Sequence, residues 1–83
     1  MRLEIKCMPS AFSAILHALH RNHLVLADDE NNVVSWTTGN RYRFVAIPVE
    51  ASVAGQDSVI AFLKGVVDLD PQADSEGLEL KWI

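Results

Sequence analysis

Three histidines, His17, His20 and His23, recur at every third position. Imidazole is a common zinc ligand, so this spacing raises the question of a metal site. On a helix, however, each step of three residues turns back by about 60°, and the three side chains fan over about 120°. Ligands spread so widely converge poorly on one ion, and no cysteine or carboxylate with metal-ligand spacing stands nearby. The sequence therefore predicts surface or structural histidines, with no metal site and no cofactor.

Two short polar segments, 28–32 and 68–77, hold seven of the eleven carboxylates. The second partly follows the calcium-loop pattern, but Ala73 stands where the sharp turn needs glycine, and Pro71 restricts the backbone. We interpret both segments as solvated turns that together form an acidic surface for a basic partner, mimicking phosphate if they lie side by side. The carboxylates assigned to this surface are Asp28, Asp29, Glu30, Asp68, Asp70, Asp74 and Glu76.

The segment 35–44, S-W-T-T-G-N-R-Y-R-F, has a Gly-Asn pair between two strand patterns. Glycine first in a two-residue loop supplies the positive φ of a type II′ hairpin. Such a loop would pair Trp36 with Arg43 and place both on one face with Arg41. Tryptophan and arginine are enriched at interface hot spots, so this patch is the second candidate contact for a protein partner. The alternatives are a cross-strand cation–π pair without a partner and a nucleic-acid contact in which a base stacks on the patch.

Periodicity predicts the elements that position these residues. Alternation of apolar and polar residues indicates strands, and apolar residues three or four apart indicate helices. Strands are expected at 2–7, 23–27, 32–37, 41–49 and 78–83, and helices at about 9–22 and 57–66, the second capped by Asp57. The residues expected to face the core are Leu3, Ile5, Cys7, Phe12, Ile15, Leu16, Leu19, Val59, Phe62, Leu63, Val66, Leu78, Leu80 and Trp82.

The order β-α-β-β-β-α-β predicts a single α+β domain over residues 1–83. Strands with one apolar face beside helices with one apolar stripe imply two layers: a mainly antiparallel sheet of four or five strands with both helices on one face. If the segment 28–32 only interrupts one long strand, the order reduces to β-α-β-β-α-β, the ferredoxin-like arrangement.

Charge and composition restrict the partners. The formal net charge of −4 disfavours anionic membranes, and it disfavours nucleic acid unless the seven lysines and arginines cluster. The single cysteine excludes an intrachain disulfide. No apolar run approaches the length of about 20 residues that spans a bilayer, and the first ten residues do not resemble a signal peptide. We therefore expect a cytoplasmic protein.

No catalytic constellation is apparent, and a chain of 83 residues leaves little volume for a substrate cleft. We therefore expect a non-enzymatic protein, monomeric or homodimeric, that acts by binding another protein. An inhibitor or adaptor that blocks a nucleic-acid-handling protein, of the kind that phages and mobile elements encode, fits the acidic segments best. Three alternatives stay open: a small-molecule-binding regulatory module that dimerises through its sheet, a small enzyme using Arg41, Arg43 and a histidine, and a nucleic-acid-binding protein.

Overall fold

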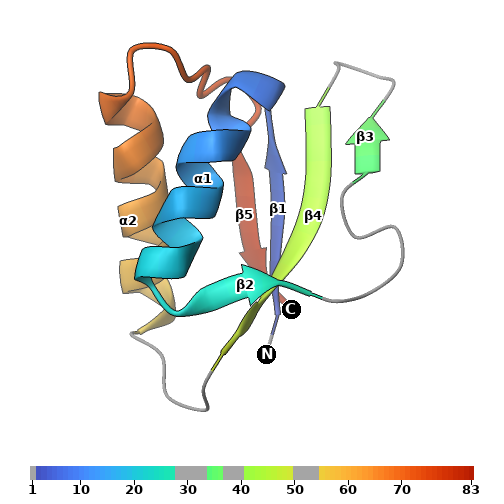
Figure 1. Ribbon diagram of the computed structural model, residues 1–83, viewed down its shortest axis with the longest axis vertical. Coiled ribbons are helices and arrows are strands. Elements are labelled where there is room, and N and C mark those ends of the chain that lie inside the picture. The colour runs from blue at the N-terminus through green and yellow to red at the C-terminus, as the bar shows by residue number, and fades with distance from the viewer. Residues whose placement is uncertain (1, 28–33, 37–40, 50–54) are drawn as a thin grey trace.

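The computed structural model describes residues 2–27, 34–36, 41–49 and 55–83, with residues 34–36 as backbone only. Figure 1 shows two helices covering one face of a sheet, which confirms the predicted two-layer α+β architecture. No helix in the described part of the chain is long and apolar enough to cross a membrane. The elements are β1 (Leu3–Cys7), α1 (Pro9–Arg21), β2 (Leu24–Leu26), β3 (Val34–Trp36), β4 (Arg41–Pro48), α2 (Gln56–Leu69) and β5 (Glu79–Trp82).

The sheet is antiparallel, with the strand order β2-β4-β1-β5 and β3 also paired with β4. The strands β2 and β3 follow one another along the same edge of β4, because Leu26 pairs with Ala46 and Val34 pairs with Arg43. Together they take the place of one edge strand that residues 27–33 interrupt. The order then reduces to β-α-β-β-α-β, so the ferredoxin-like arrangement is confirmed.

The core lies between the sheet and the helices, as the alternation in β1 predicts. Leu3, Ile5 and Cys7 are fully buried, while the residues between them are partly exposed. From α1, the ring of Phe12 packs edge-on against the rings of Tyr42 and Phe44, with centroids 5.2 and 5.0 Å away. Aromatic edge-to-face pairs of this kind stabilise a core beyond the area that they bury.

The helix α2 differs from its prediction at both ends and in the face that it buries. It ends at Leu69, because Pro71 disfavours helical backbone at the residue before it. Gly55 rather than Asp57 is its N-cap residue. The buried face continues from Leu63 to Val67 instead of to Val66.

The hairpin register also differs from its prediction. Trp36 pairs with Arg41, and Val34 with Arg43, so four residues rather than two separate the paired ends of β3 and β4. A shift of two residues keeps every side chain on its predicted face, and the alternation of the sequence therefore cannot distinguish the two registers. The predicted Gly-Asn turn lies outside the described residues.

Candidate partner-binding site

The acidic end of the protein consists of the last turn of α2 and the loop that follows it. Asp68, Asp74 and Glu76 are exposed and Asp70 is half-buried. The C-terminus of a helix carries a partial negative charge, so carboxylates there cost about 0.3–1 kcal/mol each. No basic residue lies in the last turn of α2, although α1 begins at this end and offsets part of the repulsion. The fold alone therefore gives little reason for acids at this position.

Hydrogen bonds hold the loop of the acidic end in a defined conformation. The Asp70 carboxylate accepts the backbone N–H of Gln72 at 2.9 Å, and the Asp74 carboxylate accepts that of Glu76 at 2.8 Å. The Ser10 hydroxyl, at the start of α1, accepts the backbone N–H of Asp74 at 3.0 Å. Asp side chains commonly stabilise turns by bonding the backbone two residues on. The carboxylates of the loop are thus presented in fixed positions.

Leu69 stands between Asp68 and Asp70 and is 85% exposed. A single exposed leucine is common on protein surfaces, but this one is flanked in the sequence by two aspartates at the end of a helix. An exposed apolar side chain with charged neighbours is the combination found where an interface centre meets its polar rim. Sequence reasoning missed Leu69 because it ended the helix at Val66 and assigned the D-L-D segment to a loop.

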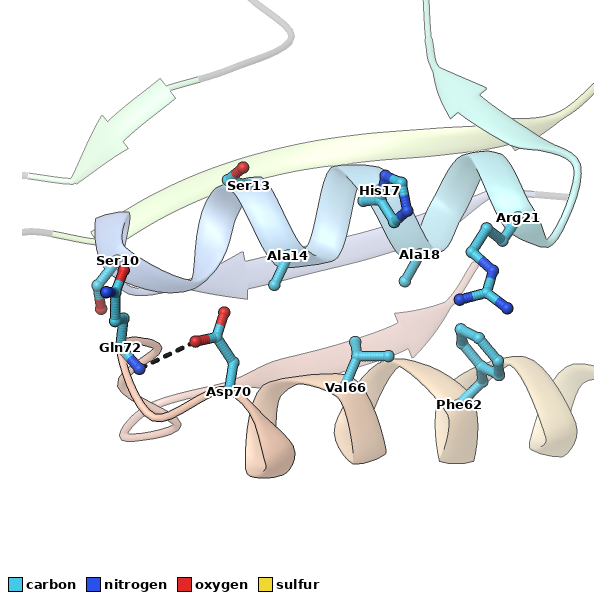
Figure 2. Close-up of a pocket in the computed structure, with 10 residues that line it drawn as sticks. All are labelled: Ser10, Ser13, Ala14, His17, Ala18, Arg21, Phe62, Val66, Asp70 and Gln72. Carbon is cyan, nitrogen blue, oxygen red and sulfur yellow. Dashed lines mark hydrogen bonds between the residues drawn. The ribbon is translucent and has the colours of Figure 1, made fainter.

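A groove of about 450 Å³ separates α1 from α2, although the short chain was expected to leave little room for a cleft. Space for the groove remains because Ala14 and Ala18 carry short side chains where they face Val66 (Figure 2). Phe62, predicted to be buried, is 36% exposed and lines the groove instead. The lining residues are Ser10, Ser13, Ala14, His17, Ala18, Arg21, Phe62, Val66, Asp70 and Gln72.

The two ends of the groove carry opposite charges, as Figure 2 shows. At one end the Arg21 guanidinium lies over the ring of Phe62, with its central carbon 5.6 Å from the ring centroid. At the other end stands Asp70, which joins the groove to the acidic end. The groove therefore suits a ligand or segment that presents an anionic group to Arg21 and a hydrogen-bond donor or cation to Asp70.

The arginines of the predicted hairpin patch are bound within the fold. The Arg43 guanidinium donates a hydrogen bond of 2.8 Å to the Glu4 carboxylate. This bond lowers the pKa of Glu4 below its ordinary value, against the opposing effect of burial. Arg41 lies 3.9 Å from Glu79, and its side chain is 34% exposed. The side chain of Trp36 lies outside the described residues, so its part in the patch stays a prediction.

The first acidic segment, with Asp28, Asp29 and Glu30, lies outside the described residues. The residues that border it, Ala27 and Val34, lie along β4 at one edge of the sheet. The loop with Asp70, Asp74 and Glu76 leads into β5 at the opposite edge. That the two acidic segments form one surface therefore stays a prediction.

The histidines and arginines of the enzyme alternative do not come together. His17 lines the groove on the helix layer, whereas Arg41 and Arg43 alternate with core residues on the far side of the sheet. His20 is exposed, and His23 follows α1 with a positive φ of 59°. Within the described residues, no group of three histidine, cysteine, aspartate or glutamate side chains has the geometry to hold a metal ion.

Comparisons with known proteins return no relative: no family model matches the chain, and no curated protein or solved structure matches it.

Proposed function

We propose that the protein is a small, non-catalytic binding protein that docks its acidic end onto a basic surface of another protein. The observation that carries the proposal is the exposed Leu69 between Asp68 and Asp70 at a helix C-terminus. Like charges at the negative end of a helix oppose stability, and an exposed leucine leaves apolar surface in water; a cationic, partly apolar partner would relieve both. Such local conflicts with folding rules are expected at functional sites.

The chemistry of the acidic end indicates the class of partner. Clustered carboxylates in fixed positions present negative charge to the arginines and lysines that otherwise hold phosphate. A protein that handles nucleic acid offers such a surface, and occupation of that surface would exclude its substrate. We therefore favour an inhibitor of a nucleic-acid-handling protein over an adaptor.

Affinity capture from the native host tests the proposal. The charge variant replaces Asp68, Asp70 and Asp74 by Asn and Glu76 by Gln. Asn keeps the side-chain oxygen that accepts the backbone N–H groups of the loop, so the variant removes charge and preserves the turns. We expect binding of the captured partner to weaken by at least about tenfold, because charged pairs at interfaces contribute strongly to affinity.

A matched control separates the contribution of Leu69 from a general effect of exposed apolar side chains. Leu69→Ser should weaken binding by about fivefold or more, whereas Ile83→Ser, which changes another exposed apolar residue, should not. Trp36→Ala combined with Arg43→Ala tests the hairpin patch separately. Unchanged capture by the charge variant and by Leu69→Ser would refute docking through the acidic end.

The groove favours a second candidate function, the binding of a small ligand by a regulatory module. Its volume of about 450 Å³ falls within the range of small-molecule sites, about 300–1,000 Å³. A ligand with an anionic group near Arg21 would raise the melting temperature of the protein, and Arg21→Ala would abolish that rise. A broad screen of carboxylated and phosphorylated metabolites without any shift would contradict this candidate.

A further inference from the structure

Five of the seven lysine and arginine residues lie on one surface, the open face, which is the side of β1, β4 and β5 turned away from the helices. Each of them alternates along its strand with a residue that packs into the core. Counting Arg2, which directly precedes β1, and the two carboxylates Glu4 and Glu79, the described residues of the open face carry a net charge of +3. The charged residues of the open face are Arg2, Glu4, Lys6, Arg41, Arg43, Glu79 and Lys81.

Pairing between the strands places these cations side by side with the two carboxylates between them. Lys6 on β1 is opposite Arg43 on β4 and Glu79 on β5, and Glu4 on β1 is opposite Lys81 on β5. Neighbouring strands lie about 4.8 Å apart, so positive charge extends over three adjacent strands. The hydrogen bond that Arg43 donates to Glu4 orients the Arg43 guanidinium, and the Arg43 side chain is 40% exposed.

The positive open face contrasts with a chain whose net charge is −4. The two signs are separated because Asp57, Asp68 and Asp70 belong to α2 or its C-cap, on the other side of the sheet. At an ionic strength of 0.1 M, charges more than about 10 Å apart are largely screened from each other. The local sign of the open face, rather than the net charge, therefore decides which ligand it attracts.

We propose that the open face binds single-stranded nucleic acid through its phosphates. A sheet of four strands is wider than either groove of undistorted duplex DNA, whereas a single strand can lie across it and contact several cations at once. Planar guanidinium groups also stack on unpaired bases. The inference does not depend on the acidic end, since none of the residues of the acidic end takes part.

The charge of the open face sets the expected strength and salt dependence. Binding of this kind is weak and independent of sequence, with a Kd of about 10⁻⁵ M near 50 mM salt. A net charge of +3 corresponds to about three neutralised phosphates. The slope of log K against log salt for a single strand should then be about −2.

Fluorescence anisotropy with the protein of 83 residues tests the inference. The probe is a labelled single-stranded DNA of about twelve mixed-sequence nucleotides, at about 50 to 200 mM salt. Lys81→Glu changes an exposed residue of the open face, and Lys64→Glu makes the same charge change on an exposed position of α2. We expect Lys81→Glu to weaken binding by about fivefold or more and Lys64→Glu by less than about twofold.

Three results would overturn the proposal. The first is no binding of the oligonucleotide at the lowest salt, and the second is equal weakening by the two variants, which would indicate a response to net charge alone. The third is tighter binding of a labelled polyglutamate peptide, which would identify the open face as a site for an acidic protein. Melting curves of both variants establish that they are folded, and Lys81→Gln serves in place of Lys81→Glu if that variant is not.

Discussion

The guanidinium group of Arg41 lies against the backbone of Gly77, in the space that a side chain at residue 77 would occupy. Gly77 has a φ of 71°, in the left-handed region that residues with a Cβ disfavour. The Arg41 side chain thus reaches from the start of β4 to the end of the acidic loop, and its guanidinium also lies 3.9 Å from Glu79. Arg41 therefore anchors the loop to the sheet, in addition to any contact that it makes with a partner.

Replacing Gly77 by alanine is expected to destabilise the protein by about 1–2 kcal/mol, because the backbone at this position is left-handed and Arg41 must move. Gly65→Ala is the matched control. A Cβ on Gly65, inside α2, would meet no atom within 4 Å, so this variant should gain about 0.5–1 kcal/mol through helix propensity. Urea denaturation measures both changes, and a loss of stability in Gly65→Ala equal to that in Gly77→Ala would contradict the argument.

The hydrogen bond between Arg43 and Glu4 predicts a pH dependence of stability. The bond lowers the pKa of Glu4 in the folded protein below the ordinary value of 4.5. The folded state therefore binds this proton less readily than the unfolded state, and the contribution is present above pH 4.5 and lost as the pH falls through the lowered pKa. The free energy of unfolding should therefore fall as the solution is made more acidic.

Glu4→Gln tests this contribution. We expect a loss of about 0.5–1 kcal/mol at neutral pH that shrinks toward zero as the pH falls through the lowered pKa of Glu4. Glu79→Gln is the control, since Glu79 is 60% exposed and lies 3.9 Å from Arg41, and its effect should be near zero. Denaturation of both variants at several pH values gives the comparison. An effect of Glu4→Gln that stays constant with pH would argue against the ion pair.

The thiol of Cys7 is expected to be unreactive in the folded protein. Cys7 is fully buried in β1, and this burial raises its pKa to about 11. An aromatic disulfide reagent should therefore modify it only at the rate of unfolding and should react at once in urea. Ser58→Cys in a Cys7→Ala background places a thiol at an exposed position and should react without denaturant. Equal rates for the two thiols would show that Cys7 is accessible.

The end of α1 offers a stabilising substitution. His23 follows the helix with a φ of 59°, and its backbone N–H donates to the carbonyl of His20 at 3.1 Å. Glycine is favoured at such a position after a helix. His23→Gly should therefore raise the free energy of unfolding by about 0.5–1 kcal/mol, whereas His20→Gly, inside the helix, should lower it by a similar amount. Thermal unfolding of the two variants measures both changes in stability. Destabilisation by His23→Gly would contradict the argument from the positive φ.

The faces of the strands could be predicted from the sequence, because alternation is a local property. It placed Leu3, Ile5 and Cys7 in the core, as the structure confirms. It could not assign the partner of Trp36, since registers that differ by two residues keep the same faces. The clustering of cations on the open face depends on which strands are neighbours in the sheet. The sequence does not give the order of β4, β1 and β5, so this clustering could not be predicted from it.

The groove and Leu69 could not be predicted for a different reason. The groove depends on how closely α1 and α2 approach, and short side chains such as Ala14 and Ala18 define it only when the two helices are placed together. Helical spacing also could not decide whether Val66 or Val67 continues the buried stripe, since both lie three or four residues after Leu63. Because Val67 rather than Val66 is buried, α2 is rotated so that Phe62 lines the groove.

Substitution by alanine should destabilise the protein strongly at one leucine of α2 and hardly at all at another. Leu63 is fully buried against the sheet, whereas Leu69 is 85% exposed at the end of the helix. Leu63→Ala is expected to cost about 2–5 kcal/mol, from lost burial and the cavity left behind. Leu69→Ala should change the free energy of unfolding by less than about 0.5 kcal/mol, because its side chain makes little contact within the fold. Chemical denaturation measures both values, and a large loss from Leu69→Ala would mean that this side chain serves folding instead of a partner.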